Sequence, residues 1–219
     1  MSVNVSDLVR IVLLSLQVSG SALLISALIG IPLGAWLGLS RFRFRQLLVT
    51  LVYTGMGFPP VVVGLAVYLA LSQAGPMGSI GWLFTAQAMI TAQVVIALPL
   101  VAGLTMAAIE GLDPDLRLQV RSLGATRRQE IISLLSEARE GVLASVVAGF
   151  GGIISEVGAA MLVGGNIAGS TRVMSTAIVL ETRQGNFGLG LALGGVLLVI
   201  VFVLNGVLLQ LQYPLWRRR

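Results

Sequence analysis

The sequence predicts an all-α integral membrane protein with five transmembrane helices. Hydrophobic residues make up 56% of the 219 residues and charged residues only 11%, too few polar side chains to cover a water-facing surface. Several uncharged stretches exceed the roughly 20 apolar residues that a helix needs to cross a bilayer. They do not alternate between polar and apolar residues, so they indicate helices rather than barrel strands. Eleven of the twenty-three charged residues gather in residues 110–140, which we term the polar loop.

The first predicted span covers residues 8–39. Asp7 and a single arginine, Arg10, precede its long uncharged run, so the segment lacks the positively charged start and short apolar core of a cleaved signal, and we interpret it as a retained span. Within it, Gly30, Gly34 and Gly38 form a doubled Gly-x-x-x-Gly pattern that permits close helix contact. Packing within one chain and packing between two copies explain this pattern equally well.

Four more spans follow along the chain. Residues 46–109 carry no charge, which is too long a stretch for one span, and the turn-rich segment 73–79 divides it in two. The polar loop then separates the third span from the fourth, and a polar, glycine-rich connection separates the fourth from the fifth. These four spans are expected at residues 47–72, 82–109, 141–163 and 187–211. The chain is thus expected to form a single transmembrane domain over residues 1–219.

The arginine distribution predicts the orientation. With five spans and the N-terminus outside, eleven of the fourteen arginines fall on the cytoplasmic side. The positive-inside rule therefore favours N-out, C-in, with the polar loop in the cytoplasm. Because solvated membrane-flanking charge explains the basic excess, we assign no nucleic-acid role to it.

The amino-acid inventory excludes several chemistries. The chain has no cysteine and no histidine, so disulfides, thiol catalysis and histidine-based metal sites or proton relays are not expected. It also has no lysine, which excludes the phosphate-binding Gly-x-x-x-x-Gly-Lys loop. We therefore expect no cofactor or metal on this chain, no catalytic residue and no ATPase site of its own.

The polar loop is predicted to form two helices joined by a tight turn. Asp113 suits the N-cap of the first helix, Pro114 its first turn, and Asp115 the positive end of its dipole. Gly124 can adopt the positive φ of a helix C-terminus, and Thr126 can cap a second helix that begins at residue 127.

The polar loop carries Leu-Asp-Pro-Asp at residues 112–115 and Leu-Gly-Ala-Thr at residues 123–126, followed by a basic amphipathic helix and a membrane span. This order resembles the cytoplasmic loop of type I ATP-binding-cassette (ABC) importer permeases. The family's Glu-Ala-Ala is replaced by Leu-Gln-Val at 118–120, and its later Leu-Pro by Ser-Glu at 136–137. The resemblance implies a coupling helix that contacts a separate ATPase subunit through Leu116, Gln119, Val120, Leu123, Gly124, Ala125, Thr126, Arg127 and Arg128.

Two further segments extend this resemblance to permeases for oxyanions such as molybdate, tungstate and sulfate. Residues 57–65, Gly-Phe-Pro-Pro-Val-Val-Val-Gly-Leu, look like their second-span motif, and residues 155–166 look like the end of their fourth core span. Residues 136–139, taken with 164–172 and Leu-Glu-Thr at 180–182, look most like the tungstate-type branch. The resemblance implies a homodimer in the plasma membrane, two ATPase subunits that carry ATP and Mg²⁺, and an extracytoplasmic substrate-binding protein.

The candidate pathway and gate residues are Pro59, Pro60, Val61, Gly152, Glu156, Asn166 and Arg172. Pro59 and Pro60 are expected to bend the second span and free carbonyl groups. Glu156 is the only ionisable residue well inside a span, and Gly152 lies on its small-residue stripe. Because a bare carboxylate would repel an anion, we expect Glu156 to have a structural or gating role, paired with Arg172 or Arg183. Asn166, Thr171 and Arg172 could receive an oxyanion outside.

The leading functional hypothesis is the permease subunit of an ATP-driven importer, with tungstate as the expected cargo and molybdate or sulfate as alternatives. Two other classes stay open. One is an ATP-independent channel or secondary transporter, which the absence of a visible internal repeat and the single intramembrane carboxylate disfavour. The other is a membrane scaffold that only recruits a soluble partner through the polar loop.

Overall fold

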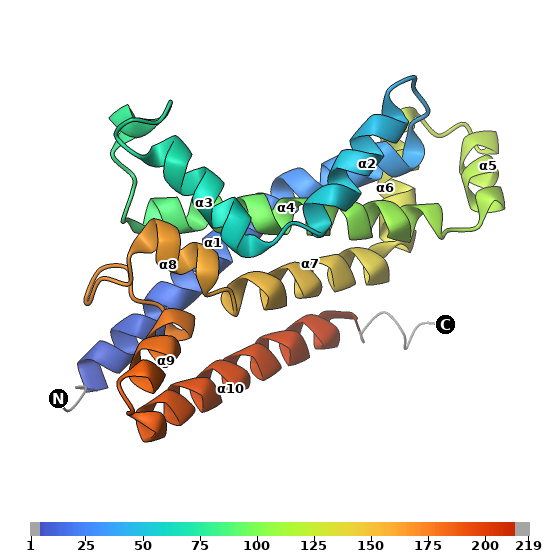
Figure 1. Cartoon of the computed structure of the whole chain (residues 1–219). Coiled ribbons are helices and arrows are strands. Elements are labelled where there is room, and N and C mark those ends of the chain that lie inside the picture. The colour runs from blue at the N-terminus through green and yellow to red at the C-terminus, as the bar shows by residue number, and fades with distance from the viewer. Residues whose placement is uncertain (1–4, 213–219) are drawn as a thin grey trace.

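A computed structural model describes residues 5–212, and within this range every regular element is a helix, as predicted (Figure 1). The elements are α1 (Val5–Leu39), α2 (Arg45–Met56), α3 (Pro60–Leu71), the short 3₁₀ turn η1 (Gly78–Ile80), α4 (Ala86–Glu110), α5 (Pro114–Ser122), α6 (Arg127–Glu137), α7 (Arg139–Ile154), α8 (Gly158–Gly164), α9 (Met174–Arg183) and α10 (Phe187–Gln212). α4 begins at Ala86 rather than at residue 82, because a turn closed by the Thr85 amide and the Trp82 carbonyl precedes it.

The glycine pattern of the first span packs α1 against α4 of the same chain. A Cβ on Gly34 would lie 2.3 Å from the Ala102 carbonyl oxygen and 2.9 Å from Thr105 Cβ, so only glycine allows this approach. A Cβ on Gly30 or Gly38 would lie 3.1 or 3.2 Å from side chains of the same helix, which is tight but less so than at Gly34. The structure therefore favours intrachain packing of this pattern over dimerisation through it.

Helix α4 occupies the middle of the bundle (Figure 1). Besides α1, it contacts α2 and α7 along one part of its length and α3 and α8 along the other. Several of these contacts are close because one partner is a glycine, as at Gly103 beside Met56 and at Gly149 beside Val101. α4 is therefore the common support for the segments that carry the candidate pathway residues.

The second predicted span is divided into α2 and α3, which meet at 103°. α2 ends at Met56, Pro59 adopts an extended conformation with ψ of 124°, and Pro60 begins α3. Proline lacks the amide that would continue α2, and it suits the first turn of the new helix. The predicted bend at this proline pair is confirmed.

The fourth predicted span, residues 141–163, is not one continuous helix. It consists of α7 and α8, which meet at 58° across residues 155–157, where the sequence has no proline. The connection that follows is not irregular throughout either, because it contains α9. The break between α7 and α8 and the presence of α9 both depend on polar side chains that are distant in sequence. One of them is Ser15, whose Oγ accepts the Met174 amide at the start of α9 at 2.8 Å.

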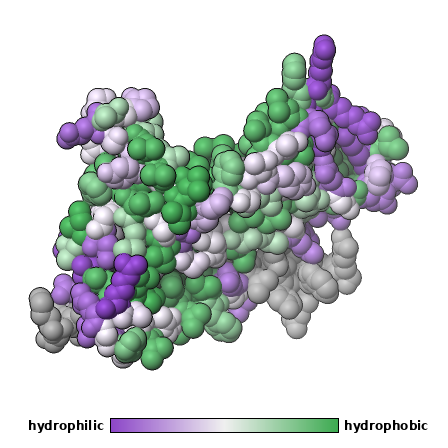
Figure 2. All heavy atoms as spheres, viewed as in Figure 1, coloured by the Kyte–Doolittle hydropathy of each residue, from purple (hydrophilic) through white to green (hydrophobic). Residues whose placement is uncertain are grey.

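Three helices are long and apolar enough to cross a membrane: Ser6–Leu39, Ala86–Glu110 and Phe187–Val207. The number rises to five if each bent pair forms one span. Figure 2 shows hydrophilic side chains over the polar loop at one end and around the start of α1 at the other, with mostly hydrophobic side chains between them. Residues 217–219, which carry three of the arginines used to predict the orientation, lie outside the described residues.

Candidate functional site

The polar loop folds as its sequence predicts. Asp113 Oδ1 accepts the Asp115 amide at 2.9 Å and caps α5, and Gly124 has a φ of +79° in the turn that follows. Thr126 and Gln129 form a reciprocal capping box at the start of α6. All three local predictions are confirmed because they depend only on neighbours in the chain.

Helix α5 and its turn present apolar side chains to solvent. Leu118 is 63% exposed and Leu123 is 88% exposed, whereas Leu116 packs inward against the buried cluster that includes Leu39 and Leu134. In Figure 1, α5 projects from one end of the molecule. Exposed leucines on a rigid, projecting helix form a surface suited to a partner protein.

The nine residues predicted to contact an ATPase therefore divide into two groups. Leu116 belongs to the small core beneath α5, and Val120 and Ala125 are half-buried. The other six are exposed along α5, the turn and the start of α6: Gln119, Leu123, Gly124, Thr126, Arg127 and Arg128. The exposed residues supply the outer surface of the loop, and the others hold it in place.

A buried carboxylate joins the two helices of the polar loop. Glu130 is 5% exposed, and its Oε1 accepts from Arg117 Nε at 2.6 Å and from Arg121 at 3.1 Å. Burial by itself raises the pKa of Glu130, but hydrogen bonds and charge from Arg121 and Arg117 outweigh it and hold the pKa below its ordinary value. This cluster was not predicted from the sequence. Its signal was two arginines four residues apart on one face of α5.

Two arginines, Arg117 and Arg127, tie the polar loop to the end of α1 and the residue that follows it. Arg117 Nη2 donates to the Leu39 carbonyl at 2.8 Å, and Arg127 Nη2 donates to Ser40 Oγ at 3.1 Å. The last carbonyls of a helix have no partner inside the helix, and cations there complement its dipole. Arg117 thus links α5 to the end of α1, and Glu130 links α5 to α6.

We expect Glu130→Gln to lower the melting temperature of the purified protein at neutral pH. The folded state depresses the pKa of Glu130 below its ordinary value of 4.5, so the ionised group stabilises the fold above that pH. This stability is lost as the pH falls through the folded-state pKa. The difference in melting temperature between wild type and variant should therefore shrink as the pH drops below 4.5. A difference that stays constant with pH would contradict the assignment.

Polar side chains from α4, from α9 and from the break itself hold the break in the fourth segment. Gln93 Nε2, from α4, donates to the Ile153 carbonyl at 3.0 Å, and Ser175 Oγ, from α9, donates to the Glu156 carbonyl at 2.9 Å. Glu156 Oε1 accepts the Ala159 amide, in the first turn of α8, at 3.0 Å. Each group satisfies a backbone atom that an unbroken helix would have satisfied itself.

Glu156 does not have the partner that the sequence analysis expected. Among the described residues, no ion pair joins it to Arg172 or Arg183, and its carboxylate serves the start of α8 instead. Gly152 is exposed, and a Cβ there would meet nothing within 4 Å. The small-residue stripe is thus not closely packed at Gly152 within this chain.

The two breaks lie side by side. A Cβ on Gly158, just after the second break, would lie 2.6 Å from Cγ2 of Val61 and 3.3 Å from Glu156 Oε1. Val61 follows Pro59 and Pro60 at the first break. The structure thus brings together four of the seven predicted pathway residues, from two segments about a hundred positions apart in sequence.

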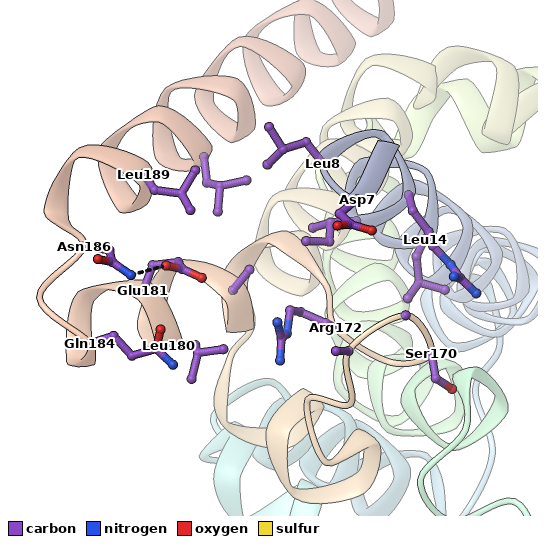
Figure 3. Close-up of a pocket in the computed structure, with 16 residues that line it drawn as sticks. Asp7, Leu8, Leu14, Ser170, Arg172, Leu180, Glu181, Gln184, Asn186 and Leu189 are labelled. Carbon is purple, nitrogen blue, oxygen red and sulfur yellow. Dashed lines mark hydrogen bonds between the residues drawn. The ribbon is translucent and has the colours of Figure 1, made fainter. Parts of the chain in front are cut away.

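Arg172 and Asn166 lie elsewhere. Arg172 lines a cavity of about 400 Å³ between α1, α9 and α10, together with Asp7, Arg10 and Glu181 (Figure 3). Neither Glu156 nor the proline pair lines this cavity. The Oε2 atom of Glu181 accepts a hydrogen bond from Asn186 Nδ2 at 2.9 Å, which Figure 3 draws as a dashed line.

The loop before α9 restricts the other predicted anion ligands. Thr171 is 1% exposed, and its Oγ1 accepts the Ile167 amide at 3.0 Å, so it holds the loop rather than facing a solute. Asn166 is half-buried with a φ of +50°, and its backbone carbonyl oxygen lies 3.5 Å from Arg172 Nη2. Of the predicted oxyanion donors, Arg172 is the one that lines the cavity.

Gln93 and Ser175 were missed by the sequence analysis. A glutamine in the middle of an uncharged span was the available signal for Gln93, because a buried amide in an apolar helix requires a partner. Nothing near Ser175 in the sequence distinguishes it from the other serines of the chain. Only the packing of α9 against the break reveals its contact.

Comparisons with known proteins agree with this architecture. The family model of the binding-protein-dependent transport system inner membrane component matches residues 30–213. A tungstate uptake system permease protein TupB from Peptoclostridium acidaminophilum is 41% identical and covers 92% of this chain and 89% of the relative. A probable anion ABC transporter permease protein from Haloferax volcanii is 40% identical, covering 93% and 90%.

More distant proteins share the same plan. The molybdenum transport system permease protein ModB from Escherichia coli K12 is 32% identical and covers 81% of this chain and 82% of the relative. A crystal structure of a bacterial ABC transporter involved in the import of the acidic polysaccharide alginate superposes with a TM-score of 0.76 at 24% identity, covering 94% of this chain and 80% of that one. The last comparison bears on the fold alone.

Proposed function

Because this chain belongs to the family of binding-protein-dependent transport system inner membrane components, we propose that it carries tungstate across the membrane as the permease subunit of an ABC importer. The chain is a transport subunit rather than an enzyme, and the ATPase is a separate subunit. The observation that supports tungstate most is the identity of about 40% to a tungstate uptake permease over nearly the whole chain. Identity to the molybdenum permease is lower, at 32%.

The polar loop is the proposed contact with the ATPase. The exposed Leu118 and Leu123 would enter a groove on that subunit, with Arg128 at the edge. Arg117 and Glu130 connect this surface to α1 and α6, so movement of the ATPase would reach the membrane helices through buried contacts. ATP and Mg²⁺ belong to the ATPase subunit, and this chain holds no cofactor in the proposal.

The assembly would contain two copies of this chain, two ATPase subunits and an extracytoplasmic binding protein. Five spans, with the N-terminus outside and the C-terminus inside, follow if each bent helix pair crosses once. This arrangement places the polar loop and eleven arginines in the cytoplasm. Arg172 and Asn166 then lie on the outer side, where a donated oxyanion would arrive, and Pro59, Val61 and Glu156 lie deeper, at the two breaks.

Uptake of metal by cells that have or lack this gene tests the proposal. Cells receive equal low concentrations of tungstate and molybdate with labelled sulfate, and elemental mass spectrometry measures the tungsten and molybdenum retained. The deletion strain is expected to lose tungsten uptake, and the restored gene to recover it. Loss of molybdenum or sulfur uptake alone would keep the importer and reject tungstate as cargo.

The competing classes are separated by reconstitution. In liposomes that contain this chain with its ATPase and binding protein, uptake is expected to require ATP. Uptake that continues without the ATPase subunit would identify a channel or secondary transporter. If the flux of every oxyanion were the same with and without this chain, while the ATPase still bound the polar loop, the chain would be a scaffold.

A further inference from the structure

The break between α7 and α8 is held by a residue with no other evident role. Gln93 lies in the apolar helix α4, is 2% exposed, and donates its Nε2 to the Ile153 carbonyl. Its Oε1 is buried with no hydrogen-bond partner among the described residues. An apolar side chain of similar length would fill this space without burying an amide. The amide is therefore explained by what it does for α7.

Gln93 fixes the end of α7 to α4. Its hydrogen bond reaches the last turn of α7. One turn earlier in α7, a Cβ on Gly149 would lie 2.9 Å from Cγ2 of Val101, which is on α4. The α7 side of the break is thus attached to the central helix at two successive turns.

Beyond the break, α8 is attached to α3. A Cβ on Gly64 of α3 would lie 2.6 Å from the Ala159 Cα, and Gly158 of α8 is equally close to Val61. α3 itself follows the other break, at residues 57–59. The two helices that follow the two breaks therefore interlock through glycines, and like α2 and α7, which precede the breaks, they also contact α4.

We propose that Gln93 is a positioning residue that anchors the end of α7 on α4, and that α3 and α8 move together as one unit about the breaks at residues 57–59 and 155–157 when the pathway changes its accessible side. Hinge movements concentrate at a few residues between rigid elements, and both breaks have this form. Ser175, which holds the Glu156 carbonyl, links the hinge to α9. This inference rests on the proposed transport function and states which helices, α3 and α8, move during transport.

The first test replaces Gln93. Gln93→Met keeps the length of the side chain but removes the donor to Ile153, and Gln87→Met is the matched control at an exposed position of the same helix. The Gln93 variant is expected to assemble with the ATPase and retain its basal ATP hydrolysis. Uptake and stimulation of hydrolysis by the binding protein should fall roughly tenfold, about the effect of losing one buried hydrogen bond. Uptake equal to that of Gln87→Met would overturn the role of Gln93.

A spectroscopic readout separates positioning from simple destabilisation. The chain has no cysteine, so one label introduced on α7 and one on α8 are the only labels it carries. Gln93→Met is expected to broaden the distribution of distances between them, while the melting temperature stays close to that of the control. An unchanged distribution would contradict the anchor.

The second test uses cysteine pairs and compares oxidised with reduced samples of the same protein. Cβ atoms at positions 61 and 158 would lie 3.7 Å apart, within the range of a disulfide. If α3 and α8 move as a unit, oxidation of the Val61→Cys, Gly158→Cys pair leaves uptake as it was when reduced. A Met89→Cys, Gly164→Cys pair joins α8 to α4, where a Cβ on Gly164 would lie 2.9 Å from Met89 Cγ, and its oxidation should stop uptake.

Uptake that falls when the pair at positions 61 and 158 is oxidised would overturn the paired movement of α3 and α8. Uptake that continues when the pair at positions 89 and 164 is oxidised would overturn it as well. Label distances between α8 and α4, measured with and without ATP in the assembled complex, do not depend on the cargo. Failure of tungstate uptake in wild type therefore rejects the proposed cargo, whereas an α8–α4 distance that ignores ATP rejects the hinge.

Discussion

Gly124→Val should abolish both uptake and the binding protein's stimulation of ATP hydrolysis, while the membrane helices still fold. Gly124 has a φ of +79°, and a Cβ there would meet nothing within 4 Å, so the effect comes from the backbone rather than from a clash. A β-branched residue in this conformation costs roughly 1–3 kcal/mol. The turn would relax, and Leu123 and the capped start of α6 at Thr126 would move relative to α5. The measurement is ATP hydrolysis by the reconstituted complex.

Gly124→Asn is the matched control. Asparagine adopts positive φ far more readily than valine, so this variant is expected to retain most of the stimulation. Co-purification of the ATPase with each variant shows whether binding or the transmission of movement is lost. Full stimulation in Gly124→Val would show that the turn does not set the position of the docking surface.

Gly34→Ala is expected to have the largest effect on stability. One added methyl group would lie 2.3 Å from the Ala102 carbonyl oxygen, so α1 and α4 would have to separate. Overpacking of this kind typically costs about 1–3 kcal/mol, and the neighbours here are backbone atoms, which yield less than side chains. The melting temperature of the purified protein in detergent, with its yield from membranes, measures the change.

Gly20→Ala provides the comparison on the same helix. A Cβ there would meet nothing within 4 Å, and alanine is favoured over glycine in a helix by up to about 1 kcal/mol. This variant should be as stable as wild type or slightly more so. Equal melting temperatures for both variants would contradict close packing of α1 on α4 at Gly34.

Local sequence patterns predicted the elements whose ends are defined by near neighbours. Asp113 and Thr126 cap their helices through residues two or three positions away, and Pro59 and Pro60 end α2 by lacking amides. The same reasoning failed at residues 155–157 and at α9. There the bonds come from Gln93, Ser175 and Ser15, which no local pattern connects to the segments they hold.

The candidate site divides in the same way. The outer surface of the polar loop was predictable from its charges, its glycine and its resemblance to permease loops, but the ion pairs of the buried Glu130 were not, because they join two helices. The predicted pathway residues separated into two places. Pro59, Val61 and Glu156 meet at the breaks, whereas Arg172 faces a cavity beside α1.

The sequence by itself determined that this is a helical membrane protein with a polar loop built for a partner, because hydropathy, helix caps and charge depend on composition and near neighbours. The tertiary structure alone decided that the glycines of the first span face α4 of the same chain, and that the fourth segment breaks at Glu156. A helix in an apolar environment can break only where other groups supply the hydrogen bonds that its backbone loses at the break. Here the partners lie on α4 and α9, and folding alone brings them to the break.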